Sequence, residues 1–346
     1  MLKAADPRYR TAHYGKWDLR AEIVPEDLGY DESDGNTGNR HGDYGSDKDT
    51  KWTAHFLNQD PKRIETLTDR AISFLRRNQA AGTPFYLQVS HYATHVDMQT
   101  RAETLAKFEA KPKGRLHSHA AWAAMLADLD TGVGRLLAEI DRLGLAESTY
   151  VIFMADNGAA EFVPPVRNKM DPPSAFAVPP RNHPLRGGKW VIYEGGIRVP
   201  FIVRGPGIKP GSQCDVPVTG WDLLPTLADL AGYRSPLPAD LDGGSFRGLL
   251  ATGAGIVRRP QEELIFHRYA SGYPHSAIRV GDHKLIKIWK TGALELYNLQ
   301  DDLGETTNLA MRLPEKAKEL HDRLLAYLKR VDAEVLHGYG KKQTED

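Results

Sequence analysis

The stretch from Leu185 to Pro206 constrains the fold of this chain more than any other. It reads L-R-G-G-K-W-V-I-Y-E-G-G-I-R-V-P-F-I-V-R-G-P, so a glycine pair stands on either side of the segment that carries Lys189. Glycine pairs allow left-handed backbone and the close approach of another segment. The apolar run Val199–Val203 has the composition of a buried strand. A lysine on such a loop suits an anion site at a sheet edge, although a plain turn with a solvated lysine fits the same residues.

The charge balance argues against a protein whose main partner is a nucleic acid or an anionic membrane. Lysine plus arginine and aspartate plus glutamate both total 45, so the net charge is zero, and Cys214 is the single cysteine. A local cationic pocket remains compatible with this balance. No apolar run approaches the roughly 18 residues that span a bilayer, and the N-terminus lacks the apolar core of a secretory signal. As written, the chain is expected to be cytoplasmic, or periplasmic or secreted if its natural start lies upstream.

Strand and helix patterns alternate along the first part of the chain, which predicts an α/β fold with a mostly parallel or mixed sheet flanked by helices. The expected strands are Thr11–Trp17, Pro84–Ser90 and Thr149–Ala155, and the expected helices are Ile64–Arg77 and Ala120–Leu143. Polar ligands bind beyond the carboxyl ends of the strands in such sheets. We therefore expect site residues just after each of the three strands.

The pattern changes after about residue 260. Four short strand-like runs lie between residues 264 and 298, and a helical pattern follows over Pro314–Val331. Short runs separated by Gly and Asp predict a small antiparallel sheet. The sequence therefore predicts two domains, residues 1–258 and residues 259–346.

Several polar residues at the predicted strand ends could carry chemistry. Asp156 and Asn157 are adjacent oxygen donors of the kind that hold Ca²⁺ or Mg²⁺, although D-N-G alone is more often a simple turn. His91 and His95 are four residues apart on a predicted loop, where that spacing does not place both side chains on one face. One functional histidine is therefore favoured over a metal pair. Lys16, like Lys189, would be a solvated lysine in most proteins if it stood alone.

Six motifs taken together, in their order along the chain, resemble the formylglycine-dependent sulfatases of the alkaline-phosphatase-like superfamily. The resemblance implies an alkaline-phosphatase-like sulfatase fold and a sulfuric ester hydrolase that acts on aryl sulfates or sulfated glycans. The motifs are Gly15–Trp17, Pro84–His95, Asp156–Gly158, Leu185–Pro200, Asp222–Leu227 and Leu296–Leu309.

The resemblance also implies a role for each matching position. Asp156 and Asn157 would ligate a divalent cation, usually Ca²⁺. Lys16 would hold the nucleophile and the sulfate oxygens, while His95 and Lys189 would contact the ester and stabilise or protonate the leaving oxygen. Sulfuryl transfer needs charge neutralised on the nonbridging and departing oxygens, which cations in a dry cleft do well.

The chain departs from the family pattern in its nucleophile. The formylglycine of the family is made from Cys or Ser in C/S-x-P-x-R, a motif this sequence lacks, and Cys214 lies in Q-C-D-V-P. The paired aspartates of the first strand of the family also have no counterpart. The chain thus begins inside the usual domain, and we expect an exposed sheet edge and weak cation binding.

A second departure concerns Asp18, which stands where the family has the histidine of G-K-W-H. A carboxylate about 4 Å from a sulfate is repelled by about 4 kcal/mol at an effective dielectric constant near 20. Asp18 must therefore pair with a cation or turn away, or the pocket binds sulfate differently from its relatives. We expect Asp18 and His91 on the substrate-binding side of the site.

Two alternatives to a sulfatase remain at this level. One is a truncated non-catalytic pseudoenzyme or anion-binding module, and the other is a phosphodiesterase or phosphonate hydrolase of the same superfamily. Substrate specificity would lie in the loops at residues 27–60 and 159–184. The oligomeric state is left open.

Overall fold

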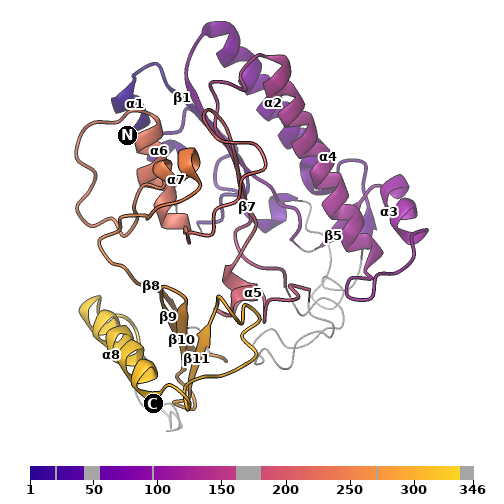
Figure 1. The fold of residues 1–346 in the computed structure, drawn as a ribbon. Coiled ribbons are helices and arrows are strands. Elements are labelled where there is room, and N and C mark those ends of the chain that lie inside the picture. The colour runs from indigo at the N-terminus through magenta and orange to yellow at the C-terminus, as the bar shows by residue number, and fades with distance from the viewer. Residues whose placement is uncertain (20–21, 43–54, 96, 161–180, 270–271, 336–346) are drawn as a thin grey trace, which may run out of the picture. The chain divides into compact units, whose positions relative to one another are not determined.

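The structure is a computed structural model, and it describes residues 1–19, 22–42, 55–95, 97–160, 181–269 and 272–335. The chain divides into two compact units, whose segments can be followed by residue number along the colour bar of Figure 1. The first unit holds Met1–Ile152 and Val203–Arg258, and the second holds Phe153–Ile202 and Arg259–Asp346. The segment 153–202, which the sequence assigns to the larger domain, thus groups with the C-terminal residues. In the described part of the chain, no helix combines the length and the hydropathy needed to cross a bilayer.

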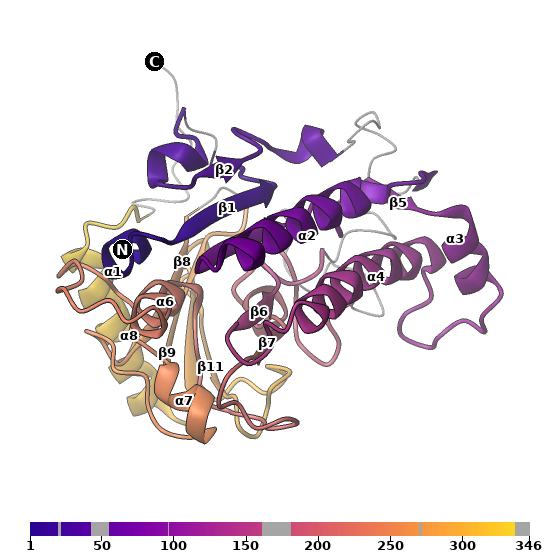
Figure 2. The ribbon, with the colours of Figure 1, turned by 90° about the horizontal axis from the view of Figure 1, so that it is seen from above.

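A parallel sheet forms the centre of the first unit, as the sequence predicts. Strand β1 (Arg10–Gly15) lies between β2 (Glu32–Ser33) and β4 (Phe85–Ser90). Helix α2 (Ile64–Ala81) packs its apolar face on this sheet, and α4 (Ala120–Arg142) runs beside α2, as Figure 2 shows. The core between α2 and the sheet consists of Ala12, Tyr14, Leu67, Ala71, Phe74 and Tyr92.

Smaller elements complete the first unit. Strand β3 pairs in parallel with β5 near α3, and the returning chain forms α6 and α7. Their bounds, with that of the N-terminal helix, are α1 Leu2–Ala5, β3 His55–Leu57, β5 Met98–Thr100, α3 Ala102–Glu109, α6 Leu223–Leu230 and α7 Arg247–Thr252.

Strand β4 lies at an edge of its sheet. Among the described residues it pairs with β1 alone, and each residue of Phe85–Ser90 is partly exposed, whereas Thr11–Gly15 of β1 are buried. Parallel strands are usually buried on both faces and flanked on both sides. The described sheet therefore has an open edge beside the residues that follow Ser90.

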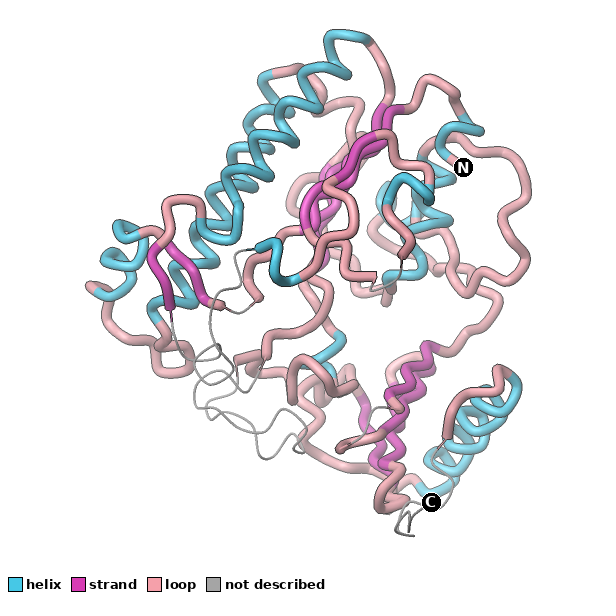
Figure 3. Tube along the Cα trace, turned by 180° about the vertical axis from the view of Figure 1, so that it is seen from behind, coloured by secondary structure: helices cyan, strands magenta, loops and turns pink. Residues whose placement is uncertain are grey.

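An antiparallel sheet and one long helix form the C-terminal part of the second unit, as predicted. The strands run in the order β11-β10-β9-β8, and α8 (Pro314–Arg330) covers one face (Figure 3). Side chains alternate between the faces with the period of a strand: Leu285 and Leu296 pack under α8, while Ile286 and Tyr297 pack on the opposite face. The strand bounds are β8 Leu264–Arg268, β9 His275–Val280, β10 His283–Ile288 and β11 Leu294–Asn298.

The face opposite α8 is covered by the glycine-bracketed stretch. Val191, Ile192 and Tyr193 are buried against the sheet in one core cluster. A single turn of helix, α5 (Glu194–Ile197), follows them, although the sequence shows no helical pattern there. The centre of the glycine-bracketed stretch is thus part of the core of the second unit.

Two strands predicted to be buried are more exposed than expected. Strands β6 (Val151–Met154) and β7 (Phe201–Arg204) form a sheet of their own. Phe153 is 40% exposed and Ile202 is 62% exposed. The prediction of burial was wrong because, within the described residues, each of these strands pairs only with the other and lacks the neighbours of a central parallel strand.

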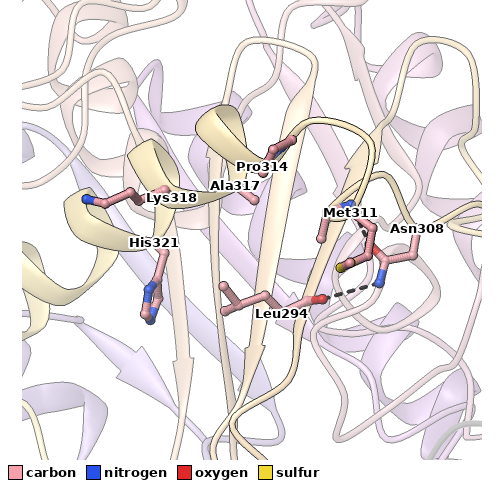
Figure 4. Close-up of a pocket in the computed structure, with 8 residues that line it drawn as sticks. Leu294, Asn308, Met311, Pro314, Ala317, Lys318 and His321 are labelled. Atoms are coloured by element: carbon pink, nitrogen blue, oxygen red, sulfur yellow. Dashed lines mark hydrogen bonds between the residues drawn. The ribbon is translucent and has the colours of Figure 1, made fainter.

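A cavity of about 370 Å³ lies beside the N-terminal end of α8 (Figure 4). Its lining is mostly apolar, and Asn308 donates a hydrogen bond to the carbonyl of Leu294 across it. Its lining includes none of the residues that the sequence singles out for chemistry. The lining residues are Leu294, Asn308, Ala310, Met311, Pro314, Ala317, Lys318 and His321.

Candidate active site

The first group of predicted residues lies at the carboxyl ends of β1 and β4. Gly15 and Ser90 are register partners at the ends of these parallel strands, and the amide of Lys16 donates to the carbonyl of Ser90 at 2.7 Å. Lys16 and His91 therefore leave the sheet side by side. The structure thus confirms that these strand ends bring the two residues together, as the parallel arrangement predicts.

Asp18 pairs with a cation, which resolves one question left by the sequence. Its Oδ2 lies 3.3 Å from Nζ of Lys16, and both side chains are mostly buried. Asp18 has a φ of +52°, the left-handed region that aspartate tolerates better than most residues. Its amide donates to the carbonyl of Thr37 at 2.7 Å, which fixes the backbone in this conformation.

The two histidines after β4 differ in their surroundings. His91 is partly buried, and burial lowers the pKa of its imidazole to about 4, so the ring is neutral at pH 7. Within the described residues its Nδ1 is buried without a hydrogen-bond partner. His95 lies on the following turn, where its amide donates to the carbonyl of Tyr92 at 3.0 Å.

Two residues that hold the Lys16 loop in place were missed by the sequence analysis. The carboxylate of Asp34 accepts the amide of Gly15 at 2.7 Å and pairs with Arg70. The hydroxyl of Thr37 donates to the carbonyl of Gly15, and its carbonyl accepts the amide of Trp17. Both residues fall in a stretch without hydrophobic periodicity, where side chains that bond to backbone leave no pattern to detect.

The second group contains Asp156, Asn157 and Lys189. The segment after β6 runs against the glycine-bracketed loop: the amide of Gly158 donates to the carbonyl of Gly196 at 3.0 Å, and the amide of Lys189 donates to the carbonyl of Ala159 at 3.2 Å. Backbone hydrogen bonds therefore fix the D-N-G turn next to the residue that carries the predicted cationic side chain.

Asn182 joins these two segments through its side chain. Its Oδ1 accepts the amide of Ala159 at 2.9 Å, while its Nδ2 donates to the carbonyls of Ala159 and Gly187 at 2.9 and 3.0 Å. Both polar atoms of the side-chain amide thus form hydrogen bonds with main-chain atoms. The sequence analysis placed Asn182 in a specificity loop, and its role as a clamp was not visible there.

Close approach of backbone requires glycine at Gly196 of the second pair, as the sequence predicts, and at Gly158 of the D-N-G turn. A Cβ on Gly158 would lie 1.7 Å from the carbonyl oxygen of Gly195, and a Cβ on Gly196 would lie 1.9 Å from that of Val191. Any larger residue at these positions would push the D-N-G turn away from the Lys189 loop.

Polar side chains of the C-terminal sheet fix the same loop. The guanidinium of Arg186 lies 4.0 Å from the ring centre of Tyr193 and donates to the hydroxyl of Tyr297 at 2.7 Å. Tyr193 and Tyr297 both donate to a carboxylate oxygen of Glu295, at 2.9 and 2.7 Å. Cation–π contact and shared hydrogen bonds of this kind hold a loop rigidly.

A buried charge cluster lies beneath the second glycine pair. Lys284 is 1% exposed, and its Nζ lies 2.8 Å from Glu194 and 2.9 Å from Glu305. Burial acts to raise the pKa of both carboxyls, and the nearby ammonium of Lys284 acts to lower it. The effect of burial is outweighed at Glu194, whose pKa is lowered, but is the stronger of the two at Glu305, whose pKa is raised. The ammonium is therefore the compensating charge for two carboxyls inside this unit.

Comparison with known proteins identifies the family to which this chain belongs. The sequence profile described as "Sulfatase" matches residues 1–233, and the profile described as "N-sulphoglucosamine sulphohydrolase, C-terminal" matches residues 187–334. The chain belongs to the sulfatase family.

Curated sulfatases extend well beyond the matched region. A protein named Sulfatase from Formosa agariphila is 34% identical over 298 residues, which cover 78% of this chain and 50% of that protein. The steryl-sulfatase of Rattus norvegicus is 34% identical over 240 residues, which cover 68% of this chain and 37% of that enzyme. The chain therefore spans half or less of the length of these two sulfatases.

Solved structures share the fold. Ps i-CgsB, solved in complex with k-i-k-neocarrahexaose, covers 94% of this chain with a TM-score of 0.72 and 23% identity, and the match covers 73% of its own chain. A protein solved with its substrate D-glucosamine-2-N,6-O-disulfate covers 96% of this chain with a TM-score of 0.70 and 18% identity, over 82% of its own chain. At these identities the likeness establishes the sulfatase fold.

Sulfatases generally use a metal ion and a formylglycine, and the described residues fit these groups only in part. Asp156 is exposed and Asn157 partly buried, and together they offer side-chain oxygens suited to a hard cation. The described ranges contain no cluster of three or more His, Cys, Asp or Glu side chains placed to hold a metal ion. Cys214 is exposed and outside any C/S-x-P-x-R motif. No reaction step is therefore derived through either group.

Proposed function

We propose that this chain carries the substrate-binding and leaving-group side of a sulfuric ester hydrolase. The observation that supports it best is the backbone clamp of the second unit, which holds Lys189 against the Asp156–Asn157 turn. These bonds fix the main chain of Lys189, which limits the positions open to its ammonium and favours a preorganised cation for the charge that develops on a departing oxygen.

Each predicted residue has a place in this proposal. Lys16 binds sulfate oxygens, while His95 and Lys189 stabilise or protonate the leaving oxygen. His91 is a neutral imidazole on the substrate-binding side of the site. Asp156 and Asn157 contribute two oxygen ligands to a divalent cation, which we take to be Ca²⁺ or Mg²⁺, and two ligands alone bind such an ion weakly.

We infer that the substrate is a sulfate ester of a sugar or an aryl alcohol. Support comes from the relatives, which include a steryl-sulfatase and an arylsulfatase A, and from the sugar ligands of the two solved structures. We expect the alcohol part of the ester to be selected by the loops at residues 27–60 and 159–184.

The experiment is hydrolysis of 4-nitrophenyl sulfate by the purified chain with added Ca²⁺. Lys189→Met removes the proposed cation, and Lys209→Met is a matched control because Lys209 is exposed and remote in sequence from either group. We expect turnover to fall at least about 100-fold in Lys189→Met, the cost of removing one electrostatic stabiliser, and to be unchanged in Lys209→Met.

The alternatives give different results. No turnover by the chain, together with retained binding of the sulfate ester, would favour a non-catalytic anion-binding module. Faster hydrolysis of 4-nitrophenyl phosphate or of a phosphodiester than of the sulfate would favour a phosphatase-like enzyme of the same superfamily.

A further inference from the structure

Asp18 lies where an anionic ligand of Lys16 would have to compete with it. The carboxylate is 3.3 Å from the Lys16 ammonium, and the side chains are only 19% and 31% exposed for Lys16 and Asp18 respectively. Oδ1 also lies close to the backbone of Gly38, 3.3 Å from where a Cβ would stand. The carboxylate thus lies between the Lys16 ammonium and the main chain at Gly38.

The backbone conformation and hydrogen bonds around Asp18 fix its position beside Lys16. Asp18 has a φ of +52°, and its amide is bonded to the carbonyl of Thr37. Thr37 is 6% exposed and also holds Gly15 and Trp17. The loop therefore aims the carboxylate at Lys16 by a conformation that is uncommon for a residue other than glycine.

We propose that Asp18 is a specificity-determining residue that selects singly charged over doubly charged anions at Lys16. The inference rests on the proposed role of Lys16 in binding the ester. A sulfate monoester carries one negative charge, whereas a phosphate monoester carries nearly two above pH 7. The repulsion from a partly buried carboxylate grows with the charge of the ligand, so Asp18 weakens binding of both esters and weakens the phosphate more.

The test is equilibrium binding of 4-nitrophenyl sulfate and 4-nitrophenyl phosphate at pH 8, measured by calorimetry. Asp18→Asn removes the charge and keeps the shape, and asparagine is well tolerated at positive φ. Asp18→Gly is a second variant that also suits this backbone. Asp130→Asn is the control, because Asp130 is an exposed acid on α4.

We expect Asp18→Asn to lower the Kd of the phosphate ester about tenfold and that of the sulfate ester about threefold, as removal of one nearby like charge should do. Asp18→Gly should shift both values in the same direction, and Asp130→Asn should change neither. Equal Kd values in wild type and in both Asp18 variants, or equal gains for the two esters, would overturn the proposal.

The same measurements separate this proposal from the proposed hydrolysis. Lys16→Met should weaken binding of both esters, because it removes the cation and leaves the Asp18 carboxylate in place. If Asp18→Asn shifts the Kd values as expected but no variant turns over the sulfate ester, the selectivity stands and the hydrolase proposal fails. If the sulfate ester is turned over but Asp18→Asn changes neither Kd, the hydrolase proposal stands and the selectivity proposal fails.

Discussion

Lys284 is the residue whose loss should damage the second unit most. It compensates two buried carboxyls, and removing one member of a buried ion cluster costs about 3–5 kcal/mol. We expect Lys284→Met to lower the free energy of unfolding by about that amount in urea denaturation.

Lys316→Met provides the comparison. Lys316 pairs with Glu319 at 2.6 Å, but both side chains are more than 40% exposed. Exposed pairs contribute about 0–1 kcal/mol, so this variant should unfold close to wild type. A similar loss in both variants would mean that burial of Lys284 is not what makes its charge important.

Buried histidines make stability depend on pH. His13 and His275 are at most 1% exposed, and burial lowers the pKa of each from 6.5 to about 4. Between pH 6.5 and pH 4 the unfolded chain binds more protons than the folded chain. The free energy of unfolding is therefore greatest above pH 6.5 with respect to these histidines, and it falls as the pH drops toward 4. Each histidine contributes up to about 3 kcal/mol to this loss.

His275→Gln isolates one of these contributions. Nε2 of His275 accepts the amide of Ile192 at 2.9 Å, and the glutamine oxygen can accept it without titrating. Urea midpoints measured from pH 7 to pH 4.5 should fall less steeply for this variant than for wild type. His117→Gln, at an exposed site, should leave the slope unchanged; identical slopes in all three proteins would refute the assignment.

At the scale of elements, two glycines of α4 should respond in opposite ways to alanine. A Cβ on Gly132 would lie 2.6 Å from Cγ2 of Ile64 on α2, whereas a Cβ on Gly134 would meet nothing within 4 Å. Gly134→Ala should stabilise the protein by about 0.5–1 kcal/mol through helix propensity. Gly132→Ala should destabilise it by about 1–3 kcal/mol through overpacking. Thermal unfolding of the two variants checks both, and a gain in each would show that α2 and α4 are loosely packed.

The elements that the sequence predicts are those with a clear hydrophobic period. Helix α4 and the four C-terminal strands follow their patterns within a few residues because one face of each is buried. The pattern of β6 and β7 is equally apolar, but an apolar run does not state how many neighbours a strand will have. That is why their exposure was not foreseen.

The sequence predicted the site residues that follow strand ends. It did not predict the residues whose side chains form hydrogen bonds with the main chain. Lys16 and His91 follow from the parallel order of β1 and β4. Asp34, Thr37 and Asn182 hold the loops through hydrogen bonds to main-chain atoms. Such bonds depend on tertiary position and leave no spacing in the sequence.

At the scale of the whole molecule, apolar side chains on the β6–β7 sheet should promote self-association. Phe153, Met154 and Ile202 are 40%, 38% and 62% exposed, and exposed apolar side chains on a short sheet favour pairing between molecules. We expect Ile202→Lys to reduce the concentration-dependent increase in sedimentation coefficient without changing the unfolding midpoint.

Ile256→Lys is the matched control, because Ile256 is 70% exposed but lies away from this sheet in the sequence. Isolated exposed apolar residues have little effect on association. Equal reduction of association by both substitutions would point to net charge, and not to the β6–β7 sheet, as the cause.

The clamp made by Asn182 has a consequence for variation in length. One side chain ties Ala159 to Gly187, so two segments that are distant in the sequence share one anchoring residue. The entropy of closing a loop rises only slowly as residues are added. We therefore expect the Asn182 clamp to hold Asn157 and Lys189 in position whatever the length of the sequence that links the two segments.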